Sequence, residues 1–131
     1  MRIVIDCNVV VAAARTPGVC RTVLVRAVAD HEIVLSPPIV AEYREVGRRP
    51  KHRPYRETMD TVTDLLERVA IVVEPDHPPF GLPDPDDEIY LVTAVVAGAQ
   101  ALVTGNLRHF PQVLCGTVAI LTPRQFLDRC G

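Results

Sequence analysis

The sequence predicts an α/β protein in which a parallel, doubly wound sheet of about five strands carries helices on both faces. Segments with strand and helix signals alternate along the chain, which is typical of a parallel sheet with crossover helices. The first apolar run, residues 3–5, is short and is followed at once by a charged residue, Asp6. Turns containing proline or glycine separate the later segments. These features predict strands whose carboxyl ends meet at one edge of the sheet, where such folds bind ligands.

Each predicted element has a local signal. A Thr-Pro-Gly turn at 16–18 separates the first two helices. Ser36 and Pro37 suit the N-cap and the first position of the next helix, and a basic, proline-containing break at 48–54 follows it. Apolar residues at helical spacing indicate a helix over 55–69, and prolines between 75 and 85 predict a stiff loop. The predicted strands are 3–5, 33–35, 70–73, 101–103 and 118–121; the predicted helices are 9–14, 21–29, 37 to about 46, 55–69, 87–97 and 123–129.

Composition predicts one globular domain over residues 1–131. The chain is 48% hydrophobic, enough for a buried core at this length. No apolar run is long enough to span a membrane, and Asp6 interrupts the first one before it could act as a leader. We therefore expect a cytoplasmic protein. Its cysteines are scattered, so we expect reduced thiols that mostly fill the core; they are Cys7, Cys20, Cys115 and Cys130.

Carboxylates and amides stand where the predicted fold can bring them together. Asp6 and Asn8 lie on the same side of an extended segment at the end of the first strand. Glu42 falls on the inward side of its helix, beside Ile39 and Val46. It is either turned inward or placed at the edge of the apolar stripe, where it reaches solvent or pairs with an arginine.

A run of acids, residues 84–88, precedes the apolar helix over 87–97. Asp84 is a good N-cap, and acids in the first turn complement the helix dipole. A single acid would suffice to cap the helix, so at least one other acid of the run is available as a metal ligand. Asn106 follows Thr104 and Gly105 after the fourth strand; it is either held at the sheet edge or part of an ordinary turn.

Oxygen-only ligation at this edge suits Mg²⁺ or Mn²⁺ rather than zinc. The histidines are dispersed without ligand spacing, and we expect surface or turn roles for three of them, His31, His52 and His77. Net charge is −2, yet six cations gather between residues 44 and 56. This segment is either a solvated helix end and loop or a contact for phosphates, which bind basic side chains without regard to sequence.

The chain resembles a PIN domain of the kind found in VapC-type toxins of toxin–antitoxin systems. The Asp-x-Asn opening at Asp6 and Asn8 is similar to the family's first motif, and the segment from Ser36 to Glu42 is similar to its second. Residues 84–87, the apolar helix and Thr-Gly at 104–105 are similar to its third motif and the strand after it. The family's third acid falls best on Asp87, which leaves Asp84 as the cap.

The resemblance implies a Mg²⁺- or Mn²⁺-dependent endoribonuclease that hydrolyses phosphodiester bonds of single-stranded RNA. It implies metal ligation by Asp6, Glu42 and Asp87, a homodimer, and inhibition by a cognate antitoxin. Asn106 stands where the family usually has an aspartate. We expect Asn106 to be one of the catalytic residues and to orient a water or bind a metal through its amide oxygen, without adding negative charge. The resemblance and the basic segment together predict substrate contacts at Asn8, Thr104, Arg108, Arg48 and Arg49.

Two other functions fit parts of the sequence. Loss of the acid at Asn106 is compatible with a catalytically weak PIN-like scaffold that binds RNA or a protein. A haloacid-dehalogenase-like phosphatase also begins with an aspartate after its first strand. That class needs a second aspartate where Asn8 stands and a later lysine to balance charge, whereas the single lysine, Lys51, lies before the third strand.

Overall fold

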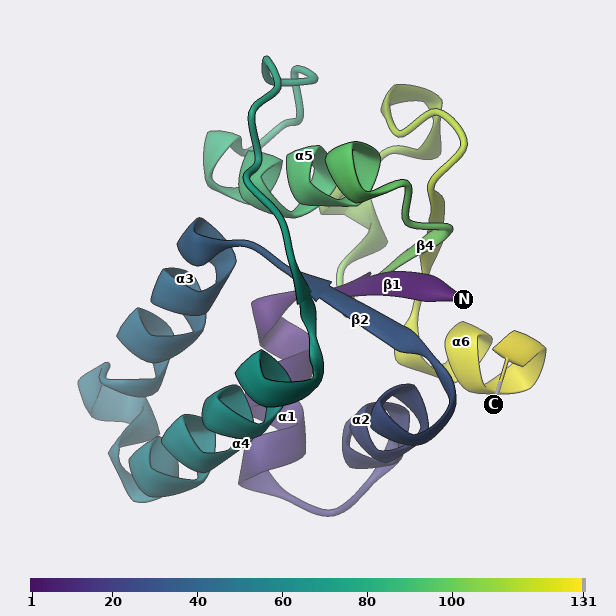
Figure 1. Cartoon of the computed structure of the whole chain (residues 1–131). Helices are drawn as coiled ribbons and strands as arrows, with labels where there is room; N and C mark the ends of the chain where they lie inside the picture. Colours follow the sequence, from purple (N-terminus) through teal and green to yellow (C-terminus); the bar gives the residue numbers. More distant parts are fainter. Residues whose placement is uncertain (131) are drawn as a thin grey trace.

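A computed structural model describes residues 1–130 and contains a five-stranded, fully parallel sheet in the order β3-β2-β1-β4-β5. The predicted α/β class with helices on both faces is confirmed. Helix α5 covers one face of the sheet, and α1, α2, α4 and α6 lie on the other (Figure 1). The strands are β1 Arg2–Ile5, β2 Glu32–Leu35, β3 Ile71–Val72, β4 Ala101–Val103 and β5 Ala119–Leu121.

The helices match the predicted order with small shifts at their ends. They are α1 Cys7–Arg15, α2 Val19–Asp30, α3 Pro37–Gly47, α4 Arg56–Val69, α5 Glu88–Ala97 and α6 Pro123–Cys130. The basic segment differs from prediction: where a break was expected over 48–54, Pro50–Tyr55 forms a 3₁₀ helix, η1. Proline fixes φ near the helical range, and two prolines four residues apart favour such a short tight turn over an open loop.

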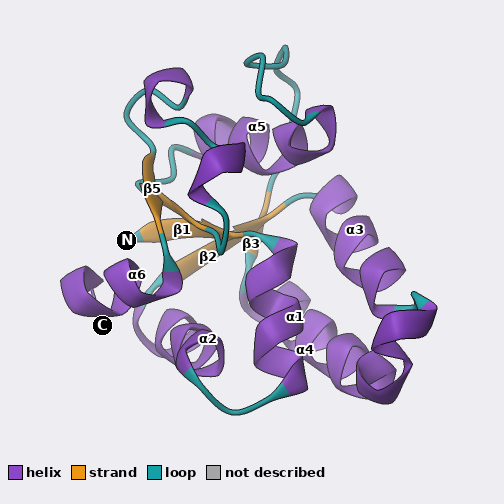
Figure 2. Cartoon of the chain, turned by 180° about the vertical axis from the view of Figure 1, so that it is seen from behind, coloured by secondary structure: helices purple, strands orange, loops and turns teal. Residues whose placement is uncertain are grey.

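The core is built around the central strand. Ile3, Val4 and Ile5 are fully buried, because β1 is flanked by β2 and β4 and covered on both faces. Figure 2 shows the opposite side of the molecule, with β5 at one edge of the sheet. All four cysteines are free, and Cys7 and Cys115 are buried, as predicted.

The order of the strands determines where a site can form. From β1 the chain moves outward to β2 and β3, then crosses back to place β4 on the other side of β1. Helices that leave the carboxyl ends of β1 and β4 therefore diverge, and a crevice opens between them. Asp6 follows β1 and Thr104 follows β4 at this crevice.

Two buried hydroxyl groups tie the helices to this edge of the sheet. Ser36 precedes α3 at the predicted N-cap, but its side chain makes no cap hydrogen bond. Its hydroxyl is instead 2.8 Å from the Thr93 hydroxyl of α5, and both residues are fully buried. The Tyr43 hydroxyl of α3 donates to the Ile5 carbonyl of β1. Helix α3, which carries Glu42, is thus anchored to β1, and the residue before α3 is tied to α5, which Asp87 precedes.

Candidate functional site

Asp6 is held by the end of the neighbouring strand. Its amide donates to the Val103 carbonyl at 2.9 Å, and its Oδ2 accepts from the Thr104 hydroxyl at 2.8 Å. Only 5% of Asp6 is exposed, and this burial raises the pKa of its carboxyl. The Thr104 hydroxyl also accepts from the Asn106 amide at 3.0 Å. Thr104 itself is fully buried, so it positions Asp6 and offers no surface to a substrate.

Asn8 links α1 to the turn after β4. Its Oδ1 accepts from the Gly105 amide at 3.0 Å. A Cβ at Gly105 would lie 3.3 Å from that oxygen, so the absence of a side chain allows this close approach. Asn8 therefore helps to join the two sides of the crevice, and it also lines the pocket described below.

Glu42 is half-buried on α3. The sequence left Glu42 either turned inward or placed at the edge of the apolar stripe near solvent or an arginine. Both alternatives are partly correct, because Glu42 lies at the border between core and solvent and lines a pocket together with Arg49. Burial raises the pKa of the Glu42 carboxyl, and the negative charge of Glu45 adds to this, whereas Arg49 opposes it.

The acids of residues 84–88 have separate tasks. Asp84 is the predicted cap, since its Oδ1 accepts from the Asp86 amide at 2.9 Å. The two oxygens of Glu88 accept from the amides of Phe80 and Leu82, each at 2.7 Å, and so hold the proline-rich loop. Asp86 is exposed. Asp87 is the acid of this run that faces the pocket.

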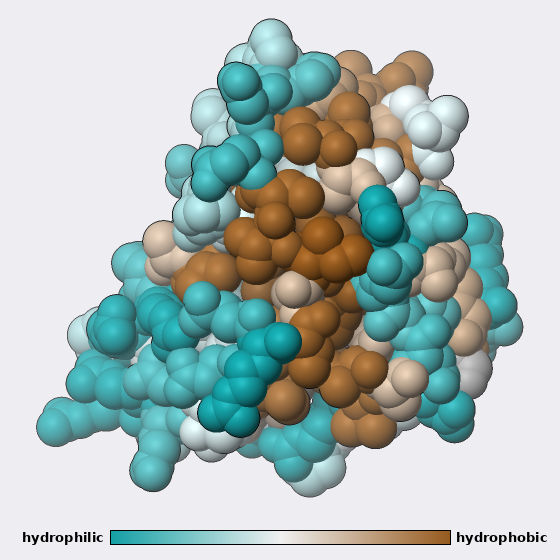
Figure 3. Space-filling model, in the orientation of Figure 1, coloured by the Kyte–Doolittle hydropathy of each residue, from teal (hydrophilic) through white to brown (hydrophobic). Residues whose placement is uncertain are grey.

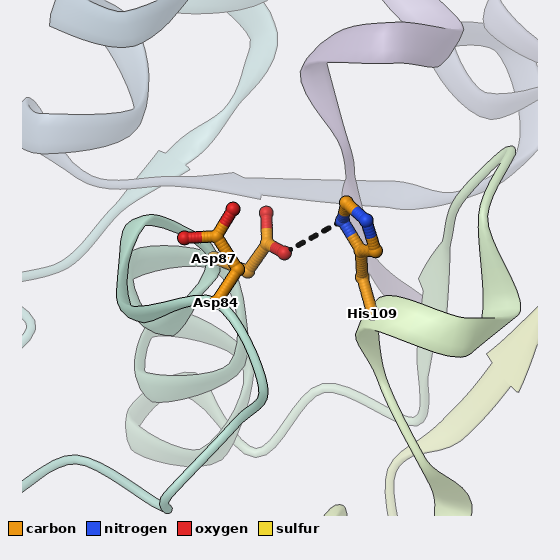
Figure 4. Close-up of side chains that lie close together, drawn as sticks. All are labelled: Asp84, Asp87 and His109. Atoms are coloured by element: carbon orange, nitrogen blue, oxygen red, sulfur yellow. Dashed lines mark ion pairs between the residues drawn. The ribbon is translucent and has the colours of Figure 1, made fainter.

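Asp87 meets His109, which arrives from the 3₁₀ helix η3, Leu107–His109. Asp87 Oδ2 lies 2.8 Å from His109 Nδ1, within ion-pair distance (Figure 4). That oxygen is buried and receives no correctly directed hydrogen bond, so the contact is a matter of proximity and charge. Burial, with the nearby charge of Asp6, raises the pKa of Asp87 to about 6, although His109 opposes the shift.

The predicted acids Asp6, Glu42 and Asp87 come from three different elements and line one pocket of about 440 Å³. They do not approach one another closely enough to form a direct three-ligand set. Within residues 1–130, one group of three side chains has ligand atoms within 4.8 Å of each other, and it consists of Asp84, Asp87 and His109. Metal binding by Asp6, Glu42 and Asp87 therefore stays a prediction.

Cations line the same pocket. Arg15 comes from the end of α1, Arg49 follows α3, and Lys51 belongs to η1; the pocket is also lined by His52 of η1, whose pKa is lowered by burial. Of the surface or turn role expected for His52, the surface role is wrong, because the residue is 9% exposed, whereas its place in the 3₁₀ turn η1 agrees with the turn role. Spacing could have revealed Arg15: the pocket residues of α1 recur at helical intervals, and they are Asn8, Val11, Ala12 and Arg15.

Besides the buried Thr104, three predicted residues lie outside the pocket. The Asn106 side chain caps η3, its Oδ1 accepting from the Arg108 amide at 3.2 Å, so the ordinary-turn alternative describes its contacts. Arg108 is exposed. Arg48 is also exposed, and it lines a different, shallow hollow on α3. Their roles in catalysis or substrate binding stay predictions.

The basic segment is more neutralised than its sequence indicates. Arg44 bridges α3 to α4 through Asp64 at 2.8 Å, Asp60 at 3.7 Å and Glu67. Arg49 pairs with Glu45 at 2.8 Å. Of the two alternatives left open for this segment, phosphate contact does not extend to Arg44, because α4 supplies acids at helical spacing that pair with it.

The comparisons with known proteins agree with this fold. The family model for the PIN domain matches residues 2–108, which is most of the chain, and the chain therefore belongs to the PIN domain family. No curated protein sequence matches it. Its structure is similar to VapBC2 from Rickettsia felis bound to a DNA fragment from their promoter, with a TM-score of 0.66, 17% identity, and coverage of 93% of this chain and 98% of that one.

A second solved structure, VapBC-1 from nontypeable Haemophilus influenzae, has a TM-score of 0.64 and 15% identity, with coverage of 95% of this chain and 99% of that one. At these identities the likeness establishes a shared fold across nearly the whole chain.

Proposed function

We propose that this chain is a metal-dependent endoribonuclease that hydrolyses phosphodiester bonds of single-stranded RNA, and that it acts in the cytoplasm as the toxin of a toxin–antitoxin pair. The observation that carries the proposal is the meeting of Asp6, Glu42 and Asp87 in one pocket at the switch point of the sheet. Membership of the PIN domain family supports the nuclease class.

The chemistry of these three carboxylates suits a divalent cation, which would have to draw them closer together than they lie in this structure. Burial raises the pKa values of all three carboxyls, and the charge of Asp6 adds to the shift at Asp87 and Glu42. A cation would relieve this repulsion and would bind the Asp87 Oδ2, which lacks a well-directed hydrogen bond. Asp6, Glu42 and Asp87 would hold Mg²⁺ or Mn²⁺, which when bound lowers the pKa of a coordinated water and neutralises charge on the phosphoryl oxygens.

The chain's own residues supply orientation and substrate binding. Thr104 holds Asp6 against the pocket through its hydroxyl. Arg15, Arg49 and Lys51 line the same pocket as the acids. A phosphate bound between the cations and the acids would be attracted by the cations, while its reacting bond would face the acids. A single strand can bend its backbone into such a pocket, whereas a duplex cannot.

Partner binding has support of a different kind. Both solved neighbours are VapBC proteins. This chain has an apolar groove of about 550 Å³ between α2 and α4, where Val25 and Leu65 are 63% and 44% exposed. Figure 3 shows apolar surface in the middle of the face on which α2 and α4 lie. We propose that a cognate antitoxin binds this chain and that the chain forms a homodimer.

None of the helices within residues 1–130 is long and apolar enough to cross a bilayer.

The decisive experiment is incubation of the purified chain with mixed single-stranded RNAs, with Mg²⁺, with Mn²⁺ and with EDTA. We expect metal-dependent cleavage that EDTA stops, and at least a hundredfold loss of rate in Asp6→Asn, Glu42→Gln and Asp87→Asn. Asp86→Asn is the matched control, because it removes an exposed acid from the same run and should keep full activity.

The scaffold alternative gains support from Asn106, whose amide oxygen is engaged in the cap of η3. It predicts that the wild-type chain binds RNA without cutting it in either metal. That outcome, measured by electrophoretic mobility alongside the cleavage assay, would replace the nuclease proposal.

A further inference from the structure

Asp84, Asp87 and His109 form a mixed cluster of oxygen and nitrogen donors at the margin of the pocket. One ligand atom from each lies within 4.8 Å of the other two. Asp84 and Asp87 belong to the turn that opens α5, and His109 comes from η3 on the far side of the crevice (Figure 4). Elements that follow different strands thus bring their donors to one place.

The spacing of the closest pair suits a shared ion. Asp87 Oδ2 and His109 Nδ1 are 2.8 Å apart. Two ligands at right angles around an ion with bonds of about 2.1 Å lie about 3 Å apart, which is close to the observed distance. The Asp87 oxygen is buried, and its near polar neighbour is the His109 ring, which does not make a well-directed hydrogen bond to it, so an ion could bind between the two groups.

The backbone fixes His109 in this position. Asn106 caps η3 with its side chain, and the His109 amide donates to the Asn106 carbonyl at 3.2 Å. The next residue, Phe110, is 1% exposed and anchors the end of the turn in the core. The His109 side chain remains 42% exposed. The imidazole is therefore preplaced beside Asp87 while its surroundings leave room for water or substrate.

We propose that Asp84, Asp87 and His109 bind a divalent transition-metal ion through a nitrogen ligand from His109, and that this site prefers Mn²⁺ to Mg²⁺. Mg²⁺ takes oxygen ligands and keeps several waters, whereas imidazole is a ligand of first-row transition ions. The inference deepens the proposed function, because Asp87 is shared with the pocket that holds Asp6 and Glu42. It also gives Asp84 a ligand role in addition to its cap.

The test is Mn²⁺ and Mg²⁺ binding to the full chain, measured by calorimetry, with Mn²⁺ electron spin-echo spectroscopy to detect a coordinated nitrogen. We expect wild-type protein to bind Mn²⁺ at least tenfold more tightly than Mg²⁺ and to show ¹⁴N coupling. His109→Gln should abolish the coupling and weaken Mn²⁺ binding at least tenfold, and Asp84→Asn should weaken it too.

His77→Gln is the matched control, since His77 is exposed and stacks on Phe80 in the loop before the acidic run. Circular dichroism checks that each variant is folded. Unchanged ¹⁴N coupling and Mn²⁺ affinity in His109→Gln would overturn the proposal, as would equal affinity of the wild type for the two ions.

These outcomes are separable from the nuclease test. RNA cleavage that depends on Asp6, together with Mn²⁺ binding that ignores His109, would retain the nuclease and reject the nitrogen ligand. Mn²⁺ binding that depends on His109, in a chain that cuts no RNA, would retain the nitrogen ligand and reject the nuclease.

Discussion

At Asp87, the burial that suits a metal ligand works against the stability of the metal-free chain. Its side chain is 14% exposed, and its pKa is raised from 3.8 to about 6 by burial and by the charge of Asp6. An acid whose pKa is higher in the folded state than in the unfolded state stabilises the fold at low pH. That stability is lost as the pH rises through the interval between the two values.

We therefore expect Asp87→Asn to be more stable than the wild type at pH 7 in EDTA. A shift of this size corresponds to at most about 3 kcal/mol. The gain should vanish below about pH 4, where the wild-type carboxyl is protonated in both states. Urea unfolding across this pH range measures it, with Asp86→Asn as the exposed control. A gain that does not change with pH would show that the raised pKa is not its source.

The predicted residues that line the pocket have local reasons for their positions. Asp6 and Asn8 follow a strand, Glu42 lies on the apolar side of a helix, and Asp87 opens another, so periodicity and caps are enough to find them. The contact of His109 with Asp87 could not be predicted this way. His109 reaches Asp87 only because Asn106 caps a 3₁₀ turn after β4, and the conformation of such a turn depends on tertiary contacts that no pattern encodes.

At the scale of elements, α5 ends at Gly98, where the backbone takes a left-handed conformation that favours glycine. Gly98 has φ of +65°, and its amide continues the hydrogen bonding of the helix end. The following residues lead into β4, so the position of Gly98 affects the strand that carries Thr104. A left-handed conformation costs an ordinary residue roughly 1–2 kcal/mol.

We expect Gly98→Ala to destabilise the chain by about 1 kcal/mol, although no atom lies within 4 Å of the added Cβ. Gly18→Ala is the matched control. It also has open space, and its backbone is extended, so the substitution adds no left-handed strain, and its smaller cost comes from the loss of a preferred N-cap residue of α2. Thermal unfolding of the two variants decides the matter, and equal melting temperatures would contradict the assigned strain.

Predicting elements was easier than predicting what their faces contact. The amphipathic pattern of residues 55–69 is sufficient to define α4, whose buried residues include Met59, Thr63 and Leu66. The same pattern says nothing about the partner of its polar face. Asp60, Asp64 and Glu67 turned out to bind Arg44, which removed this cation from the predicted phosphate-binding segment.

For the whole molecule, the arrangement of charge matters more than its sum. The net charge is −2, yet Arg15, Arg49 and Lys51 line the pocket that holds the acids. Because Arg49 is also paired with Glu45, Arg15 and Lys51 are the cations with most to offer a phosphate. RNA affinity should therefore depend on salt despite the negative net charge.

We expect Arg15→Gln and Lys51→Gln each to weaken RNA binding several-fold and to reduce the slope of log affinity against log salt by about 0.7, the value for one single-strand phosphate contact. Arg26→Gln is the control, since Arg26 is exposed on α2 and does not line the pocket. Binding is measured in EDTA, so that cleavage does not interfere. The same slope in all the proteins would remove the assigned contacts.

The division of tasks among residues 84–88 has a consequence for how this protein can vary. Asp87 faces the pocket, while its neighbour Glu88 holds the amides of Phe80 and Leu82. Each residue of a helix is turned by about 100° from the one before it. Deletion of a single residue from this run would turn the carboxylate of Glu88, which binds the loop, toward the pocket. The same deletion would turn Asp87 out of the pocket. Surface loops normally tolerate changes in length, but we expect this segment not to, so related chains that retain the site should keep its length unchanged.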